Sequence, residues 1–159
     1  MAGVQRRMLD RIGDEVARAT SIVRYARGSS FAAHVHDLGE EFLVLEGTFT
    51  DETGDFPVGT YSRHPPGSQH APSSKDGCVI LVKLRQFDPA DAQWVRTNTQ
   101  QEAWLPGACG RDHQVLPLFS RGSESVAMVS PGAEPVADVY PGGLELLVLA
   151  GRIRVNGTS

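Results

Sequence analysis

Cysteine and excess positive charge are both scarce in this sequence. Its two cysteines, Cys78 and Cys109, provide neither a disulfide framework nor a paired-cysteine zinc motif. Lys and Arg total 15 residues against 19 Asp and Glu, which gives a net charge of −4 at pH 7, and no basic stripe stands out. Because nucleic-acid-binding surfaces are usually strongly basic, we expect no nucleic-acid partner.

Long hydrophobic runs are also missing. The N-terminal residues lack the apolar stretch that a signal peptide needs, and Asp10 follows the Arg6-Arg7 pair too soon for a twin-arginine export signal. The longest apolar runs, such as residues 144–150, are much shorter than a membrane span. We therefore expect a soluble, cytoplasmic protein that has no contact with a membrane.

Glycine and proline, by contrast, are abundant. Together they make up 27 of the 159 residues, about 17% against a usual value of roughly 12%, which predicts many tight turns. Short aliphatic and aromatic runs lie between them, without the 3.6-residue periodicity of long helices. We predict strands within residues 15–27, 40–50 and 78–87, one helical turn within residues 88–95, and an all-β sandwich or barrel overall.

The chain resembles itself at an offset of 104 residues. The segment GEEFLVLEGTFTD, which starts at Gly39, lies over GLELLVLAGRIRV, which starts at Gly143. Three glycines coincide in this alignment. Two strands of similar composition can resemble one another by chance, but the coincident glycines favour a duplication.

Residues with metal-binding chemistry concentrate in two places. His34 and His36 are two residues apart, so both imidazoles project from the same face of an extended strand. The turn-rich segment GTYSRHPPGSQH supplies a third histidine, His70. Imidazole and carboxylate ligands suit Zn, Fe, Mn, Ni or Cu. An HxH pair alone is more often a pair of surface histidines, and it is the second segment that favours a metal site.

The two segments resemble the motifs of the cupin superfamily. The first motif, G(x)5HxH(x)3–4E(x)6G, is matched by Gly28, His34, His36, Glu40 and Gly47. The second, G(x)5PxG(x)2H(x)3N, is matched by Gly59, Pro65, Gly67 and His70, with Ser74 in place of the final Asn. Residues 4–105 are most similar to the cupin domain of ChrR-type anti-sigma factors. This resemblance implies an all-β cupin fold, a double-stranded β-helix or jelly-roll barrel.

The resemblance also implies a metal site. One divalent ion, with Zn or Fe first and Mn or Ni as alternatives, would be bound by His34, His36, Glu40 and His70. Glu40 rather than Glu41 keeps the spacing of the motif. Because a strand turns successive side chains to opposite faces, only one of these two carboxylates can point inward with the histidines.

We expect the remaining candidate residues to have mainly structural roles. We expect His64, directly before two prolines, at a turn or pocket rim, with contact to a ligand or metal as the less favoured alternative. His113 is expected in a solvated loop. Cys78 opens a strand and is expected to be a buried, unreactive thiol. Three further side chains are expected to pack inside the barrel: Tyr25, Phe42 and Val44.

We predict a complete metal-binding cupin module over residues 1–105 and an incomplete, degenerate second module over residues 106–159. Asp138, Tyr140 and Leu144 stand at the repeat positions of the first module's metal ligands, so no second metal site is expected. Strands around residues 126–129 and 144–155 would have unpaired edges and an uncovered apolar face, which predicts a homodimer.

The resemblance implies two functions. Three histidines and a glutamate leave two open positions on a six-coordinate metal, enough for a small-molecule substrate and O₂. One function is therefore a mononuclear non-haem dioxygenase acting on a small enolisable or diketone-like compound. The alternative is a ChrR-like module that senses or binds a ligand or metal without catalysis. A third possibility is a degenerate cupin that serves as a structural or dimerisation unit; the intact ligand set disfavours it for the first module, and the missing ligands favour it for the second.

Overall fold

The structure, a computed structural model, describes residues 3–14, 17–107, 112–132 and 140–153. Over these residues the chain forms strands and turns and no helix, which confirms the predicted all-β class. None of its described segments is a helix that could cross a membrane. The helical turn expected within residues 88–95 is wrong, because the Asp88 carboxylate accepts a hydrogen bond from the N–H of Ala90 and closes a short turn instead.

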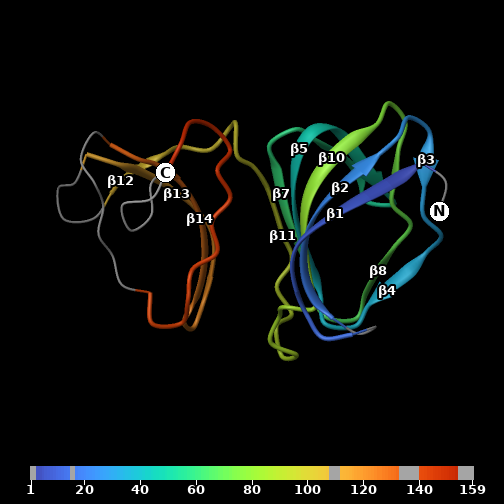
Figure 1. The fold of residues 1–159 in the computed structure, drawn as a ribbon, viewed down its shortest axis with the longest axis horizontal. Helices are drawn as coiled ribbons and strands as arrows, with labels where there is room; N and C mark the ends of the chain where they lie inside the picture. Colours follow the sequence, from blue (N-terminus) through green and yellow to red (C-terminus); the bar gives the residue numbers. More distant parts are fainter. Residues whose placement is uncertain (1–2, 15–16, 108–111, 133–139, 154–159) are drawn as a thin grey trace.

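A curled antiparallel sheet of nine strands forms most of a barrel (Figure 1). Its strands along the main path are, in spatial order, β1 (Val4–Ile12), β2 (Arg18–Tyr25), β10 (Cys78–Leu84), β5 (Glu40–Asp51), β7 (Thr60–His64) and β11 (Val95–Asn98). The sheet is extended by three short strands, β6 (Gly54–Pro57), β9 (Ser73–Ser74) and β3 (Ser29–Ser30). A separate pair, β4 (His34–His36) and β8 (Ser68–His70), lies across the barrel from the main sheet.

The barrel interior is filled by alternate residues of the central strands. In β10, Cys78, Ile80 and Val82 belong to the buried core and Leu84 packs against it, as the alternation of the sequence predicts. The rings of Phe49 and Phe42 lie 4.7 Å apart beside them. The other buried members of this core are Val23, Tyr25, Val44 and Phe56. The packing expected for Tyr25, Phe42 and Val44 is therefore confirmed.

Gly47 marks a β-bulge that changes which side chains of β5 face inward. Opposite β10, the register passes from Val44 to Glu46 without a partner for Leu45. Gly47 has a φ of +69°, and a Cβ atom there would lie 2.1 Å from the carbonyl oxygen of Gly77. Only glycine fits this position without moving the backbone. The motif glycine therefore allows β5 to approach Gly77 closely just after the bulge at Leu45.

A second, three-stranded sheet lies beside the barrel (Figure 1). It consists of β12 (Leu105–Pro106), β13 (Gln114–Arg121) and β14 (Glu124–Ser130), so that β12 spans the module boundary predicted from the sequence. The strand predicted at 144–155 is wrong over residues 144–153, which form turns and irregular chain; residues 154 and 155 lie outside the described part. The segment of the barrel that aligns with residues 144–153 in the repeat is β5, which pairs with β10 and β7. The second sheet provides no such partner strands among the described residues.

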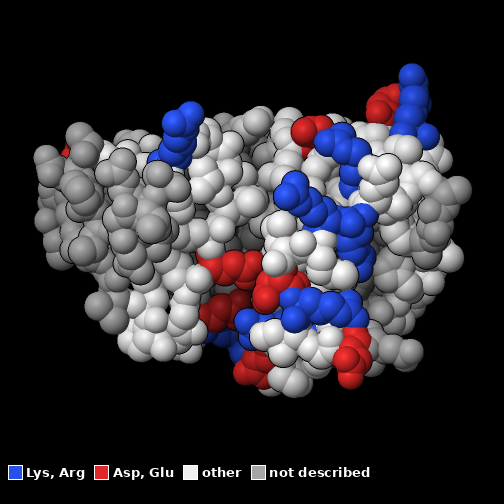
Figure 2. Space-filling view, viewed as in Figure 1, with Lys and Arg blue, Asp and Glu red and all other residues white. Residues whose placement is uncertain are grey.

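Arg63 of β7 joins the two sheets. Its side chain is fully buried, and its guanidinium lies between the rings of Phe87 and Phe119, with centroids 3.8 and 3.6 Å from Cζ. It donates to three carboxylates, those of Glu41, Asp91 and Glu124. The contact between barrel and second sheet therefore centres on one buried cation. On the face drawn in Figure 2, the exposed basic and acidic side chains lie interspersed.

Candidate metal centre

Two short strands bring three histidines together. β4 pairs with β8 in antiparallel register, with His34 opposite His70. The Nε2 atoms of His36 and His70 lie 2.9 Å apart, and the ring of His34 packs against both of their rings. His36 and His70 are buried, whereas His34 is half-buried. The three imidazoles thus form one group whose ring nitrogens can approach a common point.

Glu40, the first residue of β5, reaches the same point from the main sheet. Its Oε2 atom lies 3.3 Å from Nε2 of His70 and 3.5 Å from Nε2 of His36. This oxygen is buried and has no hydrogen-bond partner in the described part of the chain. Burying a carboxylate oxygen without a hydrogen-bond partner raises the free energy of the folded state, so we expect this oxygen to carry a proton or to contact a cation.

The neighbouring Glu41 lies on the opposite face of β5. It accepts hydrogen bonds from Tyr61 Oη at 2.7 Å and from the Arg63 guanidinium at 2.6 Å. Its carboxylate is therefore satisfied by two side chains of β7 and faces away from the histidines. Of the two adjacent carboxylates, the structure brings Glu40 to the histidine cluster.

The position of His64 in the structure differs from the one predicted from the sequence. It is neither in a turn nor at a rim: it ends β7, is buried, and lies directly opposite Glu40 in the β5–β7 register. Its Nδ1 atom is 3.9 Å from Glu40 Oε2, and its ring centroid is 5.2 Å from that of His70. Glu40, His64 and His70 form a second group of potential ligands that shares His70 with the first.

Asp51, at the far end of β5, supports His70 and was not anticipated from the sequence. Its Oδ2 atom lies 3.3 Å from Nδ1 of His70. When Nδ1–H donates to this carboxylate, the lone pair of His70 is on Nε2 and points toward Glu40, an arrangement typical of metal-binding histidines. Burial alone would raise the pKa of Asp51, but hydrogen bonds from His70 and Thr53 outweigh it and lower the pKa to about 2.

The pKa values favour metal binding by two of the clustered histidines. Burial, reinforced by neighbouring histidines, lowers the pKa of His36 to about 3 and that of His64 to about 4, so both are neutral at pH 7. Burial raises the pKa of Glu40 to about 7. Burial also disfavours the His70 cation, but the hydrogen bond to Asp51 and the charge of Glu40 outweigh this and raise the pKa of His70.

The spacing of the donor atoms fits a divalent transition metal. Ligands about 2.1 Å from an ion, at angles between octahedral and tetrahedral, lie roughly 3.0–3.4 Å from one another. The three edges of the triangle formed by His36 Nε2, His70 Nε2 and Glu40 Oε2 measure 2.9, 3.3 and 3.5 Å. Together with the unpartnered Glu40 oxygen, this spacing makes the cluster suitable for a metal ion bound by imidazole and carboxylate.

A cavity of about 400 Å³ opens onto this cluster. His34, His36 and Glu40 line one part of it, and the side chains of Arg6 and Arg85 line another. The remaining wall is largely apolar and includes Val23, Phe31, Ile80, Val82 and Leu84. The cavity can therefore hold a small molecule with an apolar body next to the donor atoms.

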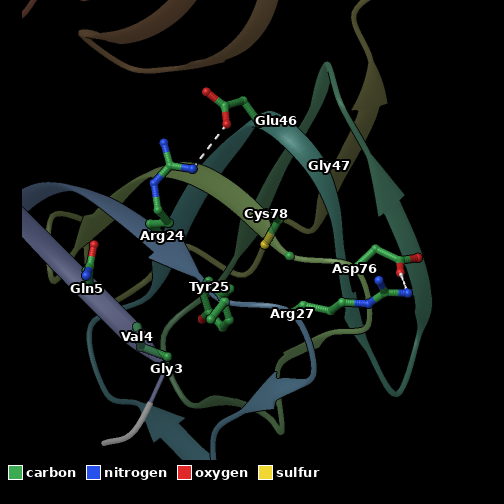
Figure 3. A pocket seen from close by; sticks show the side chains of 12 residues that line it. Gly3, Val4, Gln5, Arg24, Tyr25, Arg27, Glu46, Gly47, Asp76 and Cys78 are labelled. Carbon is green, nitrogen blue, oxygen red and sulfur yellow. Dashed lines mark hydrogen bonds and ion pairs between the residues drawn. The ribbon is translucent and has the colours of Figure 1, made fainter.

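A slightly larger cavity, of about 460 Å³, lies away from the histidines (Figure 3). Two exposed ion pairs, Arg24–Glu46 and Arg27–Asp76, lie at its edge. Cys78 is in its wall and, as expected, is a buried thiol; burial raises its pKa, which disfavours the reactive thiolate. His113 lies in the loop before β13, as expected, but it is half-buried against Gly107 rather than solvated.

Comparison with known proteins identifies relatives of the chain. Residues 1–88 match the ChrR cupin-like domain family. The complex of SigE with the anti-sigma ChrR from Rhodobacter sphaeroides matches with 26% identity and a TM-score of 0.47, over 53% of this chain and 46% of that chain. A candidate dioxygenase from Nostoc punctiforme matches with 14% identity and a TM-score of 0.65, over 80% of this chain and 51% of that chain.

The chain thus spans about half the length of these two proteins. A candidate acetylacetone dioxygenase from Methylibium petroleiphilum matches with 18% identity and a TM-score of 0.48, over 64% of this chain and 78% of that chain. No curated protein matches the chain significantly. The Nostoc structure supports the cupin-like fold, and the family match covers more than half of the sequence. The chain belongs to the ChrR cupin-like domain family.

Proposed function

We propose that this protein binds one divalent metal ion, Zn or Fe, through His34, His36, Glu40 and His70, and holds a small molecule beside it. The observation that carries the proposal is the buried Glu40 oxygen, which has no hydrogen-bond partner among the described residues and lies within 3.5 Å of two imidazole nitrogens. Its position beside a cavity of about 400 Å³ supports access for a ligand.

The enzymatic form of the proposal is a dioxygenase acting on a small enolisable or diketone-like compound. A ferrous ion would supply the redox chemistry that lets O₂ react with a singlet organic molecule. The chain's own residues would bind the substrate: aliphatic side chains of the cavity bury its apolar body and exclude water. Arg6 and Arg85 line the same cavity. Arg85 is paired with Asp37, another lining residue, at 2.7 Å, so Arg6 is the charge that would favour an enolate anion over the neutral ketone.

The test begins with the metal content of the purified protein. Iron-loaded protein is then given pentane-2,4-dione, and O₂ consumption and loss of the diketone are measured together. The enzymatic form predicts equimolar consumption of both, because a dioxygenase places both oxygen atoms in the products and needs no added reductant. A Glu40→Gln variant is the control. Stoichiometric zinc without turnover contradicts the enzyme, and absence of any stoichiometric metal contradicts metal binding itself.

The second candidate function is a sensing or binding module in which the metal or ligand alters a contact with a partner protein. The observation in its favour is that Glu40 and His64 lie next in sequence to Glu41 and Arg63. These two form an ion pair, and Arg63 also pairs with Glu124 of the second sheet. Hydrogen exchange of residues 114–130 with and without zinc tests it. Faster or slower exchange on zinc binding supports sensing, and unchanged exchange opposes it.

We also propose that the protein forms a homodimer through its C-terminal region. Five large apolar side chains there are between 39% and 60% exposed: Leu144, Leu146, Leu147, Val148 and Leu149. A second copy would cover this surface, since contiguous exposed apolar side chains commonly mark an interface. Light scattering at micromolar concentration should give twice the 17.1 kDa of one chain. A monomer under those conditions contradicts the dimer.

A further inference from the structure

We infer that His64 is a ligand of the same metal ion, so that the centre has five protein donors rather than the four that the cupin motifs supply. The inference rests on the proposed metal binding and adds a residue that lies outside the motif positions. What points to it is the arrangement around Glu40, whose buried Oε2 faces imidazole nitrogens from three different strands.

The distances place His64 within reach of a shared ion. Glu40 Oε2 is 3.3 Å from His70 Nε2, 3.5 Å from His36 Nε2 and 3.9 Å from His64 Nδ1. Around one ion, neighbouring ligands lie roughly 3.0 Å apart and ligands on opposite sides roughly 4.2 Å apart. The first two distances suit adjacent positions, and the third lies between the two values. His64 lies within 4.8 Å of Glu40 and His70 as one group, and His34 and His36 form the other group with His70, so the side chains must move closer together to bind one ion through all five.

The backbone and the surrounding rings hold the His64 imidazole in this direction. His64 lies opposite Glu40 in the antiparallel register, so both side chains extend to the same face of the sheet. Three aromatic rings pack around it, those of Phe42, Phe56 and Trp94, with centroid distances of 5.4, 6.2 and 5.0 Å. A ring enclosed in this way has little rotational freedom to lose when it binds a metal.

A fifth ligand limits what the centre can accept. With His34, His36, Glu40, His64 and His70 bound, a six-coordinate ion keeps one open position. A diketone-like ligand would then bind through one oxygen, or one protein ligand would have to leave. His34 is the best placed to do so, because it is the only half-buried member of the set and lines the cavity.

The experiment uses the full chain loaded with Co(II) or Zn(II). X-ray absorption at the metal edge counts the bound imidazoles of the unaltered protein: four are expected with His64 as a ligand, and three without it. The His64→Phe variant keeps an aromatic ring among its neighbours and removes the donor. Its matched control is His113→Phe, which replaces a half-buried histidine of the chain after β12.

In His64→Phe we expect one imidazole fewer, a changed Co(II) absorption spectrum and a metal dissociation constant raised at least roughly tenfold. His113→Phe should leave all three unchanged. Three imidazoles in the unaltered protein overturn the inference. So does a His64→Phe variant whose imidazole count equals that of the unaltered protein, whatever its affinity, because His64 would then only position other ligands. An unaltered protein that binds no metal refutes the proposed function instead.

Discussion

Replacing the buried Arg63 by methionine should strongly destabilise the protein without touching the metal ligands. The Arg63 side chain has no exposed surface and stacks between two phenylalanine rings. Nη1 lies 2.6 Å from Glu41 and 2.8 Å from Glu124, and Nη2 lies 3.1 Å from Asp91. Methionine is apolar and matches the arginine side chain only to about the position of Nε, so the substitution removes the charge, the donors and the group between the two rings.

The expected loss follows from the carboxylates that remain. Glu41 and Asp91 are buried and would lose the cation that offsets them. Breaking a buried ion pair from one side costs about 3–5 kcal/mol. Burial disfavours the Arg63 cation, but the charge of Glu41 outweighs it and raises the pKa of Arg63, so the guanidinium is charged at any working pH. We expect Arg63→Met to lower the free energy of unfolding by about 4 kcal/mol.

Urea denaturation followed by circular dichroism measures this loss, with a chelator present so that bound metal adds no stability. The matched control is Glu124→Gln: the Glu124 side chain is 39% exposed, so its ion pair should contribute less than about 1 kcal/mol. An Arg63→Met variant within about 1 kcal/mol of the unaltered protein would refute the reasoning, since the buried carboxylates would then have lost nothing.

Three predictions concern the metal centre. Glu40→Gln should weaken Zn(II) binding more than roughly tenfold, and Glu41→Gln should leave it within about twofold, as measured by chelator competition; the reverse order would exchange their roles. Below pH 7 the affinity should fall, by up to about tenfold per pH unit for each proton released, because the pKa of Glu40 is raised to about 7 and that of His70 is also raised, so that protons compete with the ion. An affinity for Zn(II) that does not change between pH 8 and pH 6 would contradict this prediction. Asp51→Asn, which keeps the shape of the side chain but loses its charge, should weaken binding roughly 10- to 100-fold with an unchanged circular dichroism spectrum; an unchanged affinity would remove Asp51 from the site.

The central strands could be predicted because their composition alternates. In β10 the apolar residues at every second position, from Cys78 to Leu84, face the core as expected. The edge strand β1 escaped prediction, because it is mostly exposed and carries charges such as Arg6, Arg7 and Asp10 in place of an apolar face. Charges of this kind are common on edge strands, where they discourage pairing with other chains.

Only some members of the histidine cluster could be predicted from the sequence, for two physical reasons. His64 alternates with Ser62 and Thr60 on a strand whose inward face is polar, so no hydrophobic pattern marks its direction. Asp51 is eleven residues after Glu40 and would face outward on a regular strand. The bulge at Leu45 shifts the alternation by one residue, which brings Phe49 and Asp51 to the inner face.

The metal centre and the contact between the sheets depend on the same strand register. In the β5–β7 pair, Glu40 lies opposite His64 and Glu41 lies opposite Arg63. The first pair faces the histidine cluster. The second faces the other side of the strands, where Arg63 also pairs with Glu124 of the second sheet. A slip by one residue would turn each side chain to the other face, placing an Arg–Glu pair among the imidazoles. The buried ion pairs of Arg63 therefore select the register in which Glu40 and His64 can meet a metal ion, because a slipped strand would leave a buried cation away from its carboxylates.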